Sequence, residues 1–105
     1  MTVTIIIPSY NQQQFLPEAI DSALQQTHKC EIVVIDDGST DGSLAVAKSY
    51  EEKGVKVISQ VNKGLPAARN TGIMNATGEF ILPLDSDDIL LENCVEKLLQ
   101  KQEET

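Results

Sequence analysis

The chain alternates short apolar runs with longer segments of mixed polarity. Four runs are rich in branched aliphatic side chains and have the length of strands: residues 3–7, 32–35, 55–58 and 80–84. At least the first two are continuous rather than alternating, which is typical of strands buried on both faces in a parallel sheet that helices cover. The pattern therefore predicts a sheet with at least two fully buried strands.

The segments between and after these runs carry apolar residues at steps of three and four, the spacing of one helix face. The four predicted stripes are Leu16, Ile20, Ala23 and Leu24; Leu44, Val46, Ala47 and Tyr50; Leu65, Ala68, Gly72, Ile73 and Ala76; and Cys94, Val95, Leu98 and Leu99. Strands alternating with helices predict one α/β domain over residues 1–105, with a Rossmann-like parallel sheet flanked by helices. Ligands of such sheets bind at the carboxyl ends of the strands.

The charge and the cysteine content indicate which ligands and which cellular compartment suit the protein. Sixteen acidic and eight basic residues give a net charge of −8, which disfavours binding to nucleic acid or to anionic lipid. Cys30 and Cys94 lie far apart and are predicted to be free thiols in a reducing compartment. No apolar run approaches the roughly 20 residues of a membrane-spanning helix. The sequence thus predicts a cytoplasmic protein, at most peripheral at the inner membrane face in a longer form.

The end of the first predicted strand carries Pro8, Ser9, Tyr10 and Asn11. These residues match neither the GxGxxG fingerprint nor the GxxxxGK[ST] loop, so a dinucleotide site of the usual kind and a P-loop are both disfavoured. By themselves the four residues also fit an ordinary strand stop followed by a turn.

The second predicted strand ends in Asp36 and Asp37, and Asp41 follows in the next loop. One of these carboxylates can cap the following helix, but capping does not explain all three. Two adjacent acids beside an apolar strand cost free energy unless each has a partner. The imide N–H of uracil is a suitable ligand donor for one of them.

Arg69 follows the third predicted strand and lies next to Ala68 in the apolar stripe of its helix. In that position its guanidinium can border a cleft and bind phosphate or carboxylate. A surface arginine that extends along the stripe into solvent fits these residues equally well.

The fourth predicted strand ends in Asp85, Ser86, Asp87 and Asp88. Three carboxylates in four residues repel one another without a cation, and a ligand set of oxygens alone suits Mg²⁺ or Mn²⁺. A helix-capping turn is the alternative. His28 falls in a loop away from these strand ends, where we expect it to be solvated, so no Ser–His–Asp or Cys–His arrangement is predicted.

Five segments taken together resemble family 2 glycosyltransferases in order and spacing: IIIPSYN at 5–11, VVIDDGSTDG at 33–42, NKGL at 62–65, ARN at 68–70 and LDSDD at 84–88. The resemblance covers nearly the whole chain. It implies the first half of a GT-A fold with strand order 3-2-1-4. It also implies an inverting, hexosyltransferase-like enzyme of cell wall or polysaccharide biosynthesis. The donor would be a nucleotide-diphosphate sugar, usually a UDP-sugar, and the acceptor an unidentified carbohydrate, lipid or protein.

The resemblance also implies roles for residues on the donor side. Pro8, Tyr10 and Asn11 would line the pocket for the base and the ribose. Asp37 would accept a hydrogen bond from the base, and Arg69 would reach toward the donor.

Asp85, Ser86 and Asp87 would form the DxD motif of the family. Asp87 would bind a Mn²⁺ or Mg²⁺ ion between the donor phosphates, and Asp85 would lie near the ion and the ribose or sugar. Asp88 would support the site from behind. By the same resemblance the first and fourth strand ends are neighbours, so Tyr10 and Asp87 should face one cleft.

The family's acceptor site and general base come well downstream of the DxD motif, so we expect this chain to lack both and name no catalytic base. Residues 80–84 would then form an unpaired edge that promotes self-association. A nucleotide-binding module without catalysis remains the alternative. A haloacid-dehalogenase-like phosphatase is a weaker one, because its DxD loop ends the first strand of its core.

Overall fold

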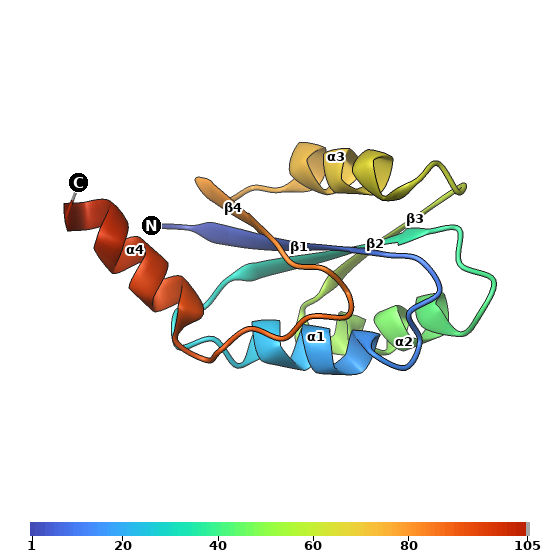
Figure 1. Cartoon of the computed structure of the whole chain (residues 1–105), viewed down its shortest axis with the longest axis horizontal. Coiled ribbons are helices and arrows are strands. Elements are labelled where there is room, and N and C mark those ends of the chain that lie inside the picture. The colour runs from blue at the N-terminus through green and yellow to red at the C-terminus, as the bar shows by residue number, and fades with distance from the viewer. Residues whose placement is uncertain (105) are drawn as a thin grey trace.

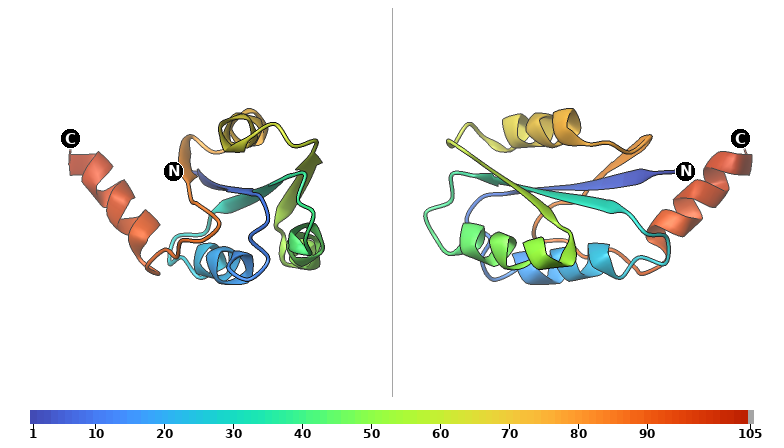
Figure 2. Two further views of the ribbon diagram at one scale, coloured as in Figure 1. Left: turned by 45° about the vertical axis from the view of Figure 1, so that its right-hand side comes forward. Right: turned by 180° about the vertical axis from the view of Figure 1, so that it is seen from behind.

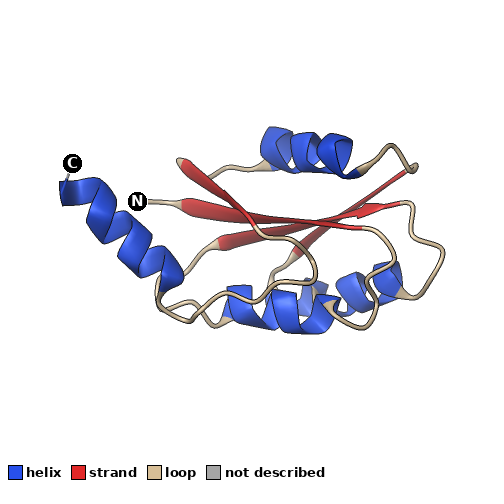
Figure 3. Cartoon of the chain, in the orientation of Figure 1, coloured by secondary structure: helices blue, strands red, loops and turns tan. Residues whose placement is uncertain are grey.

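The computed structural model describes the backbone of residues 1–104 and the side chains of residues 1–102, and Thr105, the end of the expected domain, lies outside this range. Strands and helices alternate along the chain as predicted (Figure 3). The elements are β1 (Val3–Ser9), α1 (Leu16–Leu24), β2 (Glu31–Asp37), α2 (Ser43–Ser49), the 3₁₀ turn η1 (Glu51–Lys53), β3 (Lys56–Gln60), α3 (Leu65–Asn75), β4 (Phe80–Pro83) and α4 (Cys94–Glu104).

The four strands form one parallel sheet in the order β3-β2-β1-β4, which confirms the expected strand order (Figure 1). The register pairs Ser9 of β1 with Asp36 of β2, and Asp37 of β2 with Gln60 of β3. The direction of strand addition reverses between β1 and β4. The carboxyl ends of these two strands therefore lie side by side at the switch point where α/β sheets bind ligands.

Helices cover both faces of the sheet: α3 lies on one face, and α1 and α2 lie on the other (Figures 1 and 2). Every residue of β1 is buried, and β2 is buried from Ile32 onward. Because the side chains of a strand alternate between the two faces, Ile5 and Ile7 pack in the larger core with α1 and α2. Ile6 packs in the smaller core with Ala68 of α3. Burial on both faces is thus confirmed.

Helix α3 contacts the sheet through a narrower strip than the sequence predicts. Ala68 and Gly72 are buried, but Leu65 and Ile73 of the predicted stripe are 45% and 44% exposed. The cause is close packing at Gly72, where an added Cβ would come within 2.7 Å of Cδ1 of Ile35. The helix backbone lies so near the sheet that only the smallest residues fit beneath it.

The segment after the acidic residues runs back along α1. The buried Gln26 donates through Nε2 to the carbonyl of Leu91 at 2.7 Å and accepts the N–H of Val95 at 2.9 Å. Ser22 accepts the N–H of Leu90 at 3.0 Å. Beyond this segment α4 extends past the amino-terminal side of the sheet (Figures 1 and 2). None of the described helices has the length and apolarity to cross a membrane.

The amino ends of the strands carry the histidine and one cysteine. His28 lies there as predicted and is partly exposed, with its Nε2 2.9 Å from the carbonyl of Met1. Cys30 and Cys94 are both free, as predicted. Burial raises the pKa of the Cys30 thiol.

Candidate functional site

A hollow of about 320 Å³ opens at the carboxyl ends of β1 and β4. Its walls come from the end of β1, from the first turns of α3 and from the loop after β4. The lining residues are Pro8, Tyr10, Gln12, Leu65, Arg69, Asp85, Ser86 and Asp87. The structure therefore brings together six residues that the sequence predicts for the site, with Tyr10 and Asp87 in one cleft as expected.

The local structure explains how these side chains reach the hollow. Tyr10 directly follows β1 and is 38% exposed. Leu65 and Arg69 are four residues apart on α3 and so share one helix face. Ser86 is 6% exposed and forms the buried part of the acidic turn. Each wall is thus anchored in the sheet or in a helix that packs on it.

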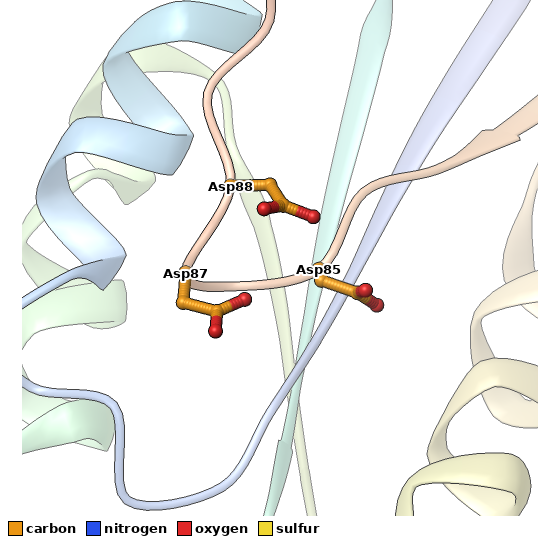
Figure 4. A group of neighbouring side chains, drawn as sticks. All are labelled: Asp85, Asp87 and Asp88. Atoms are coloured by element: carbon orange, nitrogen blue, oxygen red, sulfur yellow. The ribbon is translucent and has the colours of Figure 1, made fainter.

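The acidic turn holds three exposed carboxylates, Asp85, Asp87 and Asp88, whose nearest oxygens all lie within 4.8 Å of one another. The N–H of Asp88 donates to the carbonyl of Asp85 at 3.0 Å and closes the turn. In Figure 4 Asp85 points toward the side of α3, whereas Asp87 and Asp88 leave the turn nearer to α1. Asp87 lines the 320 Å³ hollow, and Asp88 lines a neighbouring hollow of about 490 Å³ that shares Arg69 and Asp85.

This ligand set fits a hard divalent cation. An octahedral ion with oxygen ligands at about 2.1 Å places opposite ligands about 4.2 Å apart. The carboxylate oxygens lie within 4.8 Å of one another, so small rotations of exposed side chains would bring them to that spacing. Carboxylate oxygens without nitrogen or sulfur favour Mg²⁺ or Mn²⁺ over softer metals.

Arg69 is the cationic residue of the hollow. It is exposed, and no hydrogen bond or ion pair engages its guanidinium among residues 1–102. A guanidinium with all of its donors available suits a diphosphate, which can accept two parallel hydrogen bonds.

Asn11 does not line this hollow, but it lines another of about 200 Å³ that shares Gln12 with it. Its backbone has φ of 52°, a left-handed conformation that asparagine tolerates. The side-chain oxygen accepts the N–H of Thr40 at 2.8 Å and that of Asp41 at 3.3 Å, and the backbone N–H of Asn11 donates to Ser39 at 3.0 Å. Asn11 therefore joins the end of β1 to the loop after β2.

Asp37 is also absent from the lining of the hollow, and its side chain is fully buried. Oδ1 accepts a hydrogen bond from Nε2 of Gln60 at 2.9 Å and another from the N–H of Lys63 at 3.0 Å. Oδ2 accepts the N–H of Gly64 at 2.8 Å. The chain thus donates hydrogen bonds to both carboxylate oxygens of Asp37.

This environment lowers the pKa of Asp37. Burial acts to raise the pKa, but the hydrogen bonds from Gln60, Lys63 and Gly64, with the charge of Lys63, outweigh it and hold the pKa below its usual range. Asp37 is therefore a buried carboxylate that stays ionised because the chain solvates it.

Asp36 has a different environment. Its Oδ2 accepts the N–H of Ser39 at 3.1 Å. Its Oδ1 and the hydroxyl of Ser9, the residue opposite it on β1, are buried and find no hydrogen-bond partner among the described residues. Of the two adjacent acids, only Asp37 is fully paired.

Gln12 and Leu65 line the hollow and were not predicted from the sequence. Leu65 could have been found, because it stands one helical turn before Arg69 and shares its face. Gln12 gives no such signal. It is placed by its backbone N–H, which donates to the hydroxyl of Ser43 at 3.0 Å.

Helices cover both faces of the parallel sheet, and an acidic turn and an arginine lie together at its switch point. This combination is typical of domains that bind nucleotide diphosphates. The chain belongs to glycosyl transferase family 2, whose sequence profile matches residues 4–105. The sheet and its helices match the amino-terminal half of the GT-A fold.

Three similar proteins illustrate the relationship. Glycosyltransferase GlyA of Streptococcus pneumoniae serotype 4 is 43% identical over 102 residues, which cover 94% of this chain and 15% of GlyA. The crystal structure of S. aureus TarS 1-349 in complex with UDP superposes with a TM-score of 0.90 at 33% identity, covering 99% of this chain and 32% of that one.

The mannosyltransferase PcManGT of Pyrobaculum calidifontis, solved with GDP-Man and Mn²⁺, has a TM-score of 0.76 at 30% identity, covering 83% of this chain and 28% of that one. The chain spans between 15% and 35% of the length of the first curated relatives it matches.

Proposed function

We propose that this chain is the donor-binding part of an inverting glycosyltransferase that uses a nucleotide-diphosphate sugar, with UDP as the nucleotide. The observation that carries the proposal is the hollow at the switch point, which combines an aromatic ring, a free arginine and the acidic turn. TarS was crystallised with UDP and with UDP-GlcNAc, and PcManGT with GDP-Man and Mn²⁺. These complexes support the same ligand class for this chain.

The proposed roles follow from the walls of the hollow. Tyr10 offers an aromatic face, and Pro8 a rigid apolar wall, for the base and the ribose. Arg69 would bind the diphosphate through its unengaged guanidinium, and Ser86 offers a hydroxyl to the sugar or the ribose. The net charge of −8 makes this local cation necessary for any anionic donor.

Asp87 and Asp85, both at the hollow, would hold a divalent cation, Mn²⁺ or Mg²⁺, as the DxD motif of the family implies. A bound cation would neutralise the carboxylates and the diphosphate and stabilise the charge that develops on the leaving UDP. Asp88 would support the turn from outside the hollow.

In an inverting transfer the acceptor oxygen forms a bond to the anomeric carbon as the bond from that carbon to the diphosphate oxygen breaks. The acceptor proton must pass to a general base. We assign no such base and no acceptor site to residues 1–104, and propose that both lie in sequence outside residues 1–105. A dehalogenase-like phosphatase does not fit, since its motif ends the first strand of the core and this acidic turn follows β4.

Isothermal titration of UDP decides the proposal. We expect binding in the presence of Mn²⁺ and none after EDTA, because the acidic turn repels a diphosphate without the cation. Equal heats in both conditions would refute the metal site. GDP and CDP serve as controls for the base, and tighter binding of either would refute UDP as the nucleotide while leaving the donor class in place.

A further inference from the structure

We propose that Ser22 and Gln26 are positioning residues for the acidic turn. They hold the segment that leaves the turn against α1, and so keep Asp87 close to Asp85. Neither Ser22 nor Gln26 lines the two hollows beside the turn, so both would act through the backbone that they hold. The inference rests on the proposed metal site for its functional meaning.

The acidic turn is fixed to the sheet on the side where the chain enters it. Strand β4 pairs with β1, and the N–H of Leu84 donates to the carbonyl of Ile6 at 2.9 Å. Asp85 follows directly, so the sheet determines the position of its backbone. On the other side of the turn, residues 88–91 belong to no helix or strand. The position of Asp87 therefore depends on what holds the chain after the turn.

Ser22 of α1 holds the chain two residues beyond the turn. Its hydroxyl accepts the N–H of Leu90 at 3.0 Å and donates to the carbonyl of Ala19 at 2.8 Å. Figure 1 shows the segment between β4 and α4 running beside α1. Because Ser22 is buried on a helix that packs against the sheet, this hydrogen bond ties Leu90 to the larger core.

Gln26 holds the same segment at two further points. Its Nε2 donates to the carbonyl of Leu91 at 2.7 Å and to that of Ser22 at 3.1 Å, and its Oε1 accepts the N–H of Val95 at 2.9 Å. A buried amide costs free energy unless its polar groups are paired. Leucine would fill a similar space without that cost, but it would not bind the backbone. The amide is therefore explained by the segment that it holds.

The metal site needs this hold because its carboxylates repel one another. The nearest oxygens of Asp85, Asp87 and Asp88 lie within 4.8 Å of one another, and like charges so close favour an open turn until a cation binds. Within the turn, the N–H of Asp88 donates to the carbonyl of Asp85 at 3.0 Å. The bonds from Ser22 and Gln26 oppose the repulsion from outside the turn. They keep the carboxylates near the spacing of a bound ion before the ion arrives.

The test compares Ser22→Ala with Ser49→Ala. Both hydroxyls donate to the carbonyl three residues earlier in their helix, at 2.8 Å for Ser22 and 2.6 Å for Ser49. The hydroxyl of Ser22 also accepts an N–H of the segment after the acidic turn, whereas Ser49 lies on α2, away from that segment. Gln26→Leu is the second variant and removes both of its bonds to the segment.

Three measurements are made on each variant and on the unmodified chain. Electron paramagnetic resonance of free Mn²⁺ gives the affinity for Mn²⁺ alone, without nucleotide. Amide hydrogen exchange, with and without Mn²⁺, reports on opening of residues 88–91. Urea denaturation shows that each protein is folded under the conditions of the other two measurements.

We expect Ser22→Ala to weaken Mn²⁺ binding about 3-fold and Gln26→Leu about 10-fold, because one hydrogen bond contributes a net factor of about 2 to 10 to an equilibrium constant. Exchange in residues 88–91 should become faster in both variants. Coupling between two sites is reciprocal, so saturating Mn²⁺ should slow exchange in these residues. Ser49→Ala should leave both the affinity for Mn²⁺ and the exchange in residues 88–91 unchanged.

Three results would overturn the proposal: unchanged Mn²⁺ affinity in folded Ser22→Ala, an equal loss of affinity in Ser22→Ala and Ser49→Ala, or exchange in residues 88–91 that Mn²⁺ does not slow. Unchanged affinity with reduced stability would mean that Ser22 serves the core and not the metal. If Gln26→Leu does not fold, Ser22→Ala decides alone. If the unmodified chain binds no Mn²⁺, the proposed metal site is itself wrong, and this titration distinguishes that failure from a failure of the positioning role.

Discussion

Gly38 offers a direct measure of how tightly the loops around the buried carboxylate fit together. It follows β2, has φ of 72°, and a Cβ at this position would lie 2.7 Å from the backbone nitrogen of Asn62. Asn62 belongs to the loop that wraps Asp37, and its side chain donates to the carbonyl of Asp37 at 3.0 Å. Gly38→Ala therefore forces one of two hydrogen-bonded loops to move.

Gly54 separates the two costs of this substitution. It has φ of 90°, yet a Cβ added there meets nothing within 4 Å. Left-handed backbone costs an L-residue about 1–2 kcal/mol, partly offset by about 0.4–1 kcal/mol because alanine restricts the unfolded chain. We expect Gly54→Ala to lower the free energy of unfolding by about 1 kcal/mol. Gly38→Ala should lose that amount and a further 1–3 kcal/mol, roughly the cost of overpacking.

Urea denaturation of the two variants and the unmodified chain measures both costs, that of the left-handed backbone and that of the contact with Asn62. The difference between Gly38→Ala and Gly54→Ala gives the cost of the contact with Asn62, provided that the dependence on urea has the same slope in all three proteins. Equal losses would refute the reasoning, because they would mean that the loops at Gly38 and Asn62 separate without cost.

Three further predictions concern the metal, acid and the sheet edge. Asp87→Ala should weaken Mn²⁺-dependent UDP binding more than Asp88→Ala, because Asp87 lines the 320 Å³ hollow and Asp88 does not. Thermal melts of the two variants without ligand should barely differ. Unfolding of the Asp87 variant would instead indicate that the acidic turn caps a helix. The lowered pKa of Asp37 means that its ionised form stabilises the fold above about pH 4 and that this contribution is lost as pH falls below it. Acid melts of Asp37→Asn should therefore be flatter than those of the unmodified chain. The edge strand β4 exposes Ile81, so we expect concentration-dependent association in light scattering, reduced by Ile81→Lys; an unchanged mass would exclude the edge as its cause.

The fold could be predicted because burial on both faces leaves a strong pattern in the sequence. Continuous aliphatic runs such as Ile5–Ile7 have few alternatives to a covered parallel strand, and the order of strands followed from the family resemblance. The meeting of Tyr10 and Asp87 followed from the same order, since both lie in the segments that follow two neighbouring strands. These features depend on the topology of the sheet, which follows from the order of strands and helices along the chain.

Details that depend on single dihedral angles or on close packing could not be predicted. Asn11 has a left-handed backbone and accepts hydrogen bonds from the loop after β2, neither of which its neighbours in the sequence specify. Leu65 and Ile73 stay exposed because Gly72 allows α3 to lie almost on the sheet. Helical periodicity identifies a face but not how deeply that face is buried.

The different surroundings of Asp36 and Asp37 could have been predicted from the alternation of side chains along β2. On a strand, neighbouring side chains point to opposite faces, so the two acids of a pair at a strand end cannot share one partner. The alternation of Ile32, Val33, Val34 and Ile35 between the two cores carries Asp36 to the layer of α1 and α2 and Asp37 to the layer of α3. Asp37 then faces the loop before α3, in which the N–H groups of Lys63 and Gly64 donate to its carboxylate. The period of the strand, applied to its last two residues, therefore predicts that the two acids have different surroundings on opposite faces of the sheet.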